Sequence, residues 1–157
     1  MADPEDSLPK VTTPRIQDVA NTQVEDLRLM LLDRFPDNYS IKTDDFFFSD
    51  IELMEALRRS VQAYNALPPV TIRARYNLVP DEYLLLIGAA WQACLSKLMY
   101  YRRKQTTYAS GSTQVDMYGA ICSALQDAAQ EFKAEFKELG LSIKRQQNIK
   151  RYMGRIG

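Results

Sequence analysis

The sequence contains no histidine and only 2 cysteines among its 157 residues. Without histidine, the chain lacks the commonest general base and the commonest metal ligand. Two distant thiols with no imidazole cannot supply the four ligands of a usual zinc site. Cys94 and Cys122 each lie within an apolar helical pattern, which favours buried free thiols over a disulfide. Catalysis would have to rely on carboxylates, lysines, hydroxyls or thiols.

Glycine is also scarce, and none of the 6 glycines begins a phosphate-binding loop. Asp50 and Glu52 lie two positions apart at a predicted helix start, so their side chains diverge and do not form a catalytic acid pair. The adjacent acids Asp44 and Asp45 lack the alternating oxygen ligands and the glycine of a calcium loop. No nucleophile and base can be paired. We therefore expect a non-enzymatic protein with no cofactor and no metal.

The chain has no net charge, because 20 basic side chains balance 20 acidic ones. Overall charge therefore does not indicate capture of nucleic acid. The distribution is uneven, since residues 1–50 hold 5 basic and 11 acidic side chains whereas residues 97–157 hold 11 and 5. One interpretation is chance segregation of solvated charge. The other is a polarity that lets copies dock side by side and close into a ring.

No apolar run reaches the roughly 20 residues that a membrane-spanning helix needs. The longest one, residues 83–96, is bounded by Glu82 and Lys97, and it predicts a central core helix. The first residues lack the basic and then apolar pattern of a signal peptide. We expect no membrane contact and a reducing, cytoplasmic setting.

Hydrophobic periodicity predicts a mainly α-helical fold, a helical bundle of about four helices with one short extended segment. Residues 1–21 carry three prolines and no apolar periodicity, which predicts an extended N-terminal arm. We expect a helical body over residues 22–141 and a basic C-terminal tail over residues 142–157. Alternating apolar and polar residues place the extended segment at residues 70–76.

Capping patterns predict where the first two helices begin. Thr22 and Glu25 have capping-box spacing, so the first helix is expected to start near Thr22 and to end at Phe35-Pro36. Ser49 and Glu52 form a second capping box, and the double proline after residue 67 stops that helix.

The third and fourth helices are predicted from other signals. Pro80 suits the first turn of the third helix, which is expected to end in a basic cluster at residues 102–104. Residues 108–113 have the composition of a loop. An apolar seam over residues 117–139 predicts the fourth helix, and Gly140 is expected just past its end.

Two basic segments are candidates for contact with a partner. Cations at a helix end interact with the helix dipole, but they can also line a DNA channel or an interface; this group is Arg102, Arg103 and Lys104. The tail mixes cations with apolar side chains, which favours contact with another subunit or with nucleic acid. Its candidate residues are Lys144, Arg145, Ile149, Lys150, Arg151, Tyr152 and Arg155.

Residues 48–69 resemble a pattern of the head-to-tail adaptor proteins in the neck of tailed bacteriophages. In that pattern an aromatic residue and an acid open a helix, which ends in an aromatic residue, an asparagine and a double proline. An apolar helix, an arginine-rich turn, a long helix and a basic tail follow in the same order, so the similarity covers about residues 46–157. The matching positions are Phe48, Asp50, Glu52, Asn65, Pro68, Pro69, Gly88, Tyr108 and Gly111.

The resemblance implies a structural virion protein that is assembled in the host cytoplasm. Its copies would form a homo-oligomeric ring between the portal and the tail or nozzle proteins, and the ring would line the DNA channel and contact genomic DNA without sequence preference. On this basis the basic tail is expected to contact the portal or a neighbouring subunit. Two alternatives stay open: another phage tail or baseplate component, and a small helical nucleic-acid-binding module.

Overall fold

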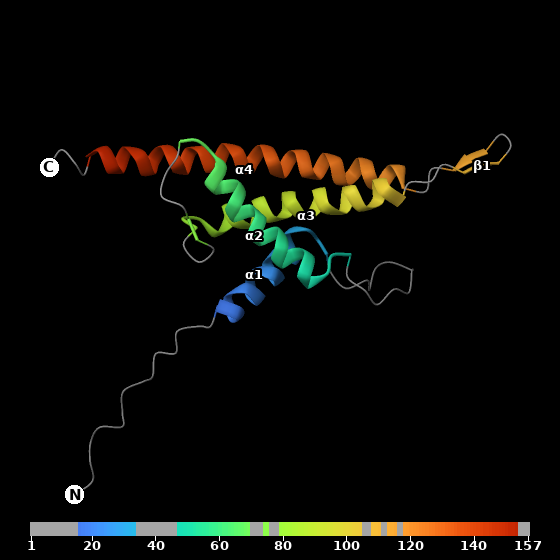
Figure 1. The fold of residues 1–157 in the computed structure, drawn as a ribbon, viewed down its shortest axis with the longest axis horizontal. Helices are drawn as coiled ribbons and strands as arrows, with labels where there is room; N and C mark the ends of the chain where they lie inside the picture. The colour runs from blue at the N-terminus through green and yellow to red at the C-terminus, as the bar shows by residue number, and fades with distance from the viewer. Residues whose placement is uncertain are drawn as a thin grey trace, which may run out of the picture.

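A computed structural model describes residues 16–33, 47–69, 74–75, 79–104, 108–110, 113–115 and 118–153. These residues form four helices, which confirms the predicted mainly α-helical fold of about four helices (Figure 1). The helices are α1 (Ile16–Met30), α2 (Asp50–Ala66), α3 (Glu82–Lys104) and α4 (Gly119–Met153). The strands β1 (Tyr108–Ser110) and β2 (Thr113–Val115) pair antiparallel, with Ala109 opposite Gln114. Two short paired strands therefore occupy described residues of a segment in which composition predicted a loop.

Helix α3 is the central element of the fold. It runs antiparallel beside α4, while α2 and α1 pack on it from another side (Figure 1). Every residue from Leu84 to Ala90 is buried, as the uncharged run within this helix predicts. The prediction of a central core helix is therefore confirmed, although Tyr83 and Leu95 at the ends of the predicted run are exposed. None of the helices in the part of the chain that the structure describes is long and apolar enough to span a membrane.

Helix α2 begins as its sequence predicts. The Ser49 hydroxyl accepts the Glu52 backbone N–H, and the Glu52 carboxylate accepts the Ser49 backbone N–H, so both halves of the capping box are present. Leu53, Leu57 and other residues on one stripe of the helix are buried. Ile51, in the first turn of the helix, is 80% exposed.

Helix α1 begins at Ile16, earlier than the predicted start near Thr22. The segment just before Thr22 contains no proline, so helical backbone can continue through it. The helix ends in a Schellman arrangement, in which the Asp33 N–H donates to the Arg28 carbonyl and the Leu32 N–H to the Leu29 carbonyl. Leu32 takes the left-handed position with φ of 54°. The rest of the predicted arm, residues 1–15, lies outside the described residues.

Helix α4 continues through Gly140 to Met153, so the prediction that the helix ends before Gly140 was wrong. Residues 142–153 of the predicted tail are helical. Gly140 is buried, and a Cβ atom there would lie 2.6 Å from Leu67 Cδ1. The glycine thus permits a close crossing of α4 and the end of α2. Of the predicted extended segment at residues 70–76, only Ala74 and Arg75 are described, and neither belongs to a regular strand.

Candidate functional site

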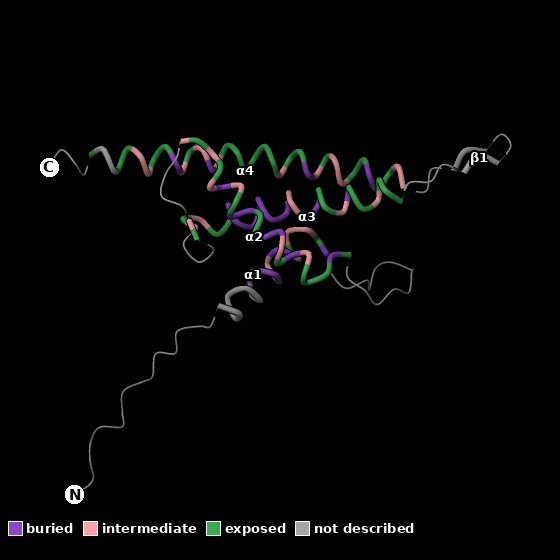
Figure 2. Tube along the Cα trace, viewed as in Figure 1, coloured by how far each residue is buried: buried purple, intermediate pink, exposed green. Residues whose placement is uncertain are grey.

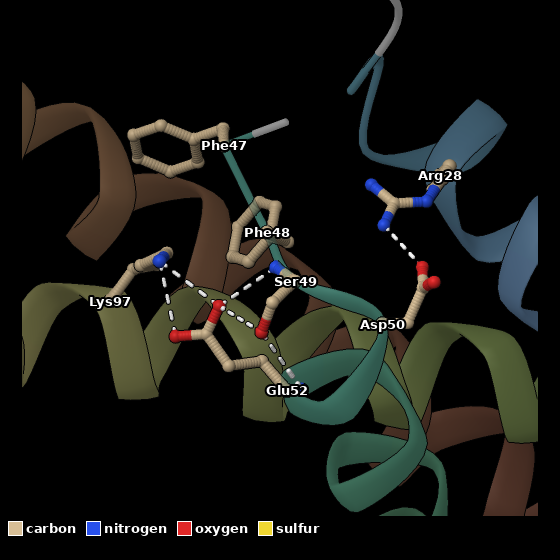
Figure 3. Close-up of a pocket in the computed structure, with 7 residues that line it drawn as sticks. All are labelled: Arg28, Phe47, Phe48, Ser49, Asp50, Glu52 and Lys97. Carbon is tan, nitrogen blue, oxygen red and sulfur yellow. Dashed lines mark hydrogen bonds and ion pairs between the residues drawn. The ribbon is translucent and has the colours of Figure 1, made fainter. Parts of the chain in front are cut away.

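The start of α2, the end of α1 and the middle of α3 enclose a recess of about 390 Å³, which we call the α2 recess (Figure 3). Three of the positions that matched the adaptor pattern lie on its wall. Its lining residues are Arg28, Phe47, Phe48, Ser49, Asp50, Glu52 and Lys97.

The Asp33 carboxylate joins α1 to the residues that precede α2. It accepts the backbone N–H groups of Phe47 and Phe48 at 3.0 and 3.1 Å, and a third hydrogen bond comes from Arg28 Nη1 at 2.7 Å. Arg28 also reaches Asp50 at 2.5 Å (Figure 3). The buried carboxylate is therefore satisfied by backbone and guanidinium donors, which offsets the cost of its burial. These bonds hold the two helix ends together.

Lys97 closes the other side of the recess. Its Nζ lies 3.0 Å from both carboxylate oxygens of Glu52 and 5.5–5.7 Å from the ring centroids of Phe47, Phe48 and Tyr100. Burial raises the pKa of Glu52, but the Ser49 N–H and Lys97 together outweigh it and hold that pKa below its usual value. Glu52 is therefore a capping and pairing group.

Aromatic rings extend from the recess toward the start of α4. Phe47 stacks on Tyr101 with centroids 5.9 Å apart, and Tyr101 lies 5.4 Å from Tyr118. Phe48 is buried under Phe47 in an edge-to-face contact. Phe48, Asp50 and Glu52, singled out in the sequence for the family pattern, are thus brought together at one site.

The remaining pattern positions lie elsewhere. The Asn65 side chain donates to the Ala74 carbonyl at 2.9 Å and accepts the Ala74 N–H at 2.8 Å, so it holds the chain that follows Pro68 and Pro69. Gly88 lies where α2, α3 and α4 cross, and Tyr108 lies in β1. Gly111 is outside the described residues.

The two basic segments are not brought together. Arg102, Arg103 and Lys104 are exposed at the end of α3, whereas the cations after Gly140 lie at the opposite end of α4 (Figure 1). Arg102 donates to the Gln126 side chain at 2.5 Å, and Lys104 donates to the Tyr100 hydroxyl. A single continuous basic surface is therefore not formed by the described parts of these segments.

Lys144 was expected to be an exposed contact residue, but it is only 1% exposed. Its Nζ donates to the carbonyl oxygens of Leu67 and Asn65 and lies 5.0 Å from the Tyr64 ring centroid. Burial lowers the pKa of this lysine. Lys144 thus caps the C-terminal end of α2, where a cation interacts favourably with the helix dipole. Lys144 lies four residues after buried Gly140 and eight after buried Phe136, which places it on the buried face of the helix. This spacing is the signal in the sequence that could have predicted its burial.

The structure describes the side chains of only some of the other expected contact residues. Arg145, Ile149 and Lys150 are exposed on α4. Arg151 and Tyr152 belong to the helix, but their side chains lie outside the description, as does Arg155.

Both cysteines are buried and free, which confirms the prediction. Burial raises the pKa of Cys94 to about 11, which favours the protonated thiol. No group of three or more potential metal ligands occurs in the part of the chain that the structure describes. Comparison of the chain with protein-family models, curated proteins and solved structures finds no match.

Proposed function

We propose that this chain is a structural, non-enzymatic virion protein, a head-to-tail adaptor whose copies form a ring between a phage portal and the tail. The observation that carries the proposal is the resemblance of residues 48–69 to the adaptor pattern. Support comes from the structural work that these residues do. Glu52 and Asn65 fasten the two ends of α2 to other parts of the fold, and Phe48 is buried in a core cluster with residues of α1, α2 and α3.

The form of α4 also supports a scaffold role. The helix spans 35 residues, which corresponds to about 52 Å at 1.5 Å per residue. Its last turns, with exposed Ile149 and Lys150, extend beyond the rest of the bundle (Figure 1). A preformed helix of this kind can contact a portal or a neighbouring subunit without the entropic cost of folding on binding.

In the proposed ring, the cations at the end of α3 contact the passing DNA. Arg102, Arg103 and Lys104 are exposed, and no carboxylate of the described residues forms an ion pair with them. Such cations neutralise phosphates without reading the base sequence.

A portal-binding experiment tests the adaptor. The full chain is incubated with purified portal of the same phage and imaged in negative stain, and we expect a ring added to one face of the portal. Ile149→Asp is expected to weaken this addition, whereas Ile51→Asp, which changes an exposed isoleucine at the other side of the bundle, should not. Portal particles that remain bare with the wild-type chain would refute the adaptor role, and a map that places the chain in the baseplate would support the tail alternative.

A second candidate function is a nucleic-acid-binding helical module, and the exposed cluster of Arg102, Arg103 and Lys104 beside Tyr100 favours it. Burial of Lys144 removes one cation from the segment first considered for this role. This function predicts DNA affinity that falls steeply with salt, as counterions are released. A triple change of these three residues to glutamine should abolish the affinity, while Lys137→Gln serves as the control. Affinity that survives the triple change would exclude this cluster as the binding site.

A further inference from the structure

One side of α4 is exposed along the helix, and we call it the outer face (Figure 2). Exposed residues recur on it at steps of three, four and seven, which places them on one stripe of an α-helix. They include Asp127, Glu131, Ala134, Glu138, Arg145 and Ile149. The opposite side of the helix carries Phe136 and Gly140 and packs on the core.

The first half of the outer face is acidic. Asp127, Glu131, Glu135 and Glu138 are all exposed, and they follow one another at intervals of three or four residues. Like charges at these intervals destabilise a helix. No salt bridge in the described part of the chain includes any of the four, although Glu135 accepts a hydrogen bond from the Tyr83 hydroxyl. This half therefore favours a cationic partner.

The second half of the outer face is apolar and basic. Ile149 and Met153 are 58% and 71% exposed, one helical turn apart, and Arg145 and Lys150 lie beside them. The backbone here is held in place, because Lys144 caps α2 and Gln147 accepts the Tyr64 hydroxyl at 3.4 Å. An ordered surface of this composition complements the acidic half of the same face.

We infer that two copies of the chain associate through their outer faces with the α4 helices antiparallel. An antiparallel alignment that crosses near Ser142 brings Ile149 of one copy onto Ala134 of the other, and Arg145 beside Glu138. A parallel, in-register alignment would instead oppose acid to acid. The antiparallel contact is isologous, since the same patch serves both copies and each charge pair occurs twice. The overlap of residues 130–153 is about 36 Å long at 1.5 Å per residue.

This dimer goes beyond the adaptor role and does not depend on it. It covers Arg145 and Ile149, the surface proposed above to meet the portal. In the free protein the contact therefore masks the assembly surface, and incorporation into a ring requires the pair to separate.

Sedimentation equilibrium of the full chain tests the contact. The wild-type chain is expected to dimerise, and Ile149→Asp should raise the dimer Kd about tenfold or more, as loss of a buried apolar anchor does. Ile51→Asp is the matched control and should leave the Kd unchanged. A wild-type chain that stays monomeric at every concentration reached, or a dimer that Ile149→Asp does not weaken, would overturn the inference.

A charge swap tests the register. Glu138→Arg and Arg145→Glu should each weaken the dimer, and the two changes together in one chain should restore it, because the opposite charges face each other again. Lys137→Glu alters a cation of α4 away from the outer face and is expected to have no effect. A double variant no tighter than the single ones would contradict this register.

Cysteine cross-linking tests the direction of the helices. A mixture of an Ala134→Cys chain and an Ile149→Cys chain should form a disulfide between the two variants, while the native Cys94 and Cys122 are buried. Disulfides between two Ile149→Cys chains would instead show parallel helices, and mixtures without cross-links would count equally against the antiparallel pair. The portal is absent from all three experiments, so their failure leaves the test of the adaptor role intact.

Discussion

Replacing Gly88 by alanine should destabilise the fold, although alanine is the better helix former. Gly88 is buried in α3 where α2 and α4 both approach it. A Cβ atom there would lie 2.2 Å from Ser60 Oγ and 2.6 Å from Phe136 Cε2. Both distances are well below van der Waals contact, so the two neighbours would have to move.

Three effects determine the change in the free energy of unfolding. Alanine gains roughly 0.8–1 kcal/mol of helix propensity over glycine. Overpacking of a close crossing costs roughly 1–3 kcal/mol. Moving Ser60 also breaks its hydrogen bond to the Leu85 carbonyl, 2.9 Å long, which is worth about 1 kcal/mol. We therefore expect a net loss of about 1–3 kcal/mol, or a fall in Tm of roughly 2–12 °C for a chain of this size.

Gly140→Ala is the matched control. The atom that its Cβ would meet, Leu67 Cδ1 at 2.6 Å, is the end of a flexible and only half-buried side chain. Leu67 can rotate away, so helix propensity should dominate and stability should be unchanged or rise by up to about 1 kcal/mol. Thermal and urea unfolding followed by circular dichroism measure both variants. A Gly88→Ala chain as stable as the wild type, or more stable than Gly140→Ala, would refute the argument.

Three further substitutions have defined outcomes. Lys144→Met should cost about 1–2 kcal/mol in urea unfolding, because two carbonyl groups of the α2 end lose a donor, while exposed Lys150→Met should change stability by less than about 0.5 kcal/mol. Leu32→Gly should stabilise by about 0.5–1 kcal/mol, since it relieves a left-handed conformation in a residue that is 77% exposed. The pKa of Glu52 is lower in the folded chain than in the unfolded one, so the ionised carboxylate stabilises the fold. This stabilisation is fully present above the unfolded-state pKa and is lost as the pH falls through the folded-state pKa. The stability difference between wild type and Glu52→Gln, below about 1 kcal/mol for this partly exposed carboxylate, should accordingly vanish in acid; a difference that grows on acidification would contradict the assignment.

The sequence predicts well those features that short-range chemistry determines. The capping box of α2 needs only Ser49 and Glu52, so its spacing was sufficient. The core role of α3 also follows from composition, because an uncharged, apolar run that includes small residues such as Gly88 favours burial on all sides of the helix. Each of these predictions rests on residues within a few turns of one another.

Sequence reasoning failed or was silent where the role of a residue depends on a contact with a residue far away in the sequence. A glycine near the end of an apolar seam can mark the end of the helix or a place where another helix passes close by. The close approach of Leu67, which is far away in the sequence, identifies Gly140 as the crossing point. Lysine is usually exposed, so Lys144 was expected at the surface. It can be buried because carbonyl groups at the end of α2 accept hydrogen bonds from its Nζ. The Asp33 contact to Phe48 spans 15 residues and carries no pattern in the sequence.

Both ends of α2 are fixed by side chains from other helices, and this determines how the chain can meet a partner. Lys97 and Arg28 hold its start, while Lys144 and Gln147 of α4 hold its end. Because the anchoring residues of α4 reach position 147, the turns that follow continue a helix that is already tied to the bundle. A partner that binds Ile149 therefore meets an ordered helical surface and avoids most of the conformational entropy that a tail folding on contact would lose. Specificity then has to come from the geometry of the outer face of α4, and a second copy presents the complementary charges in that same geometry.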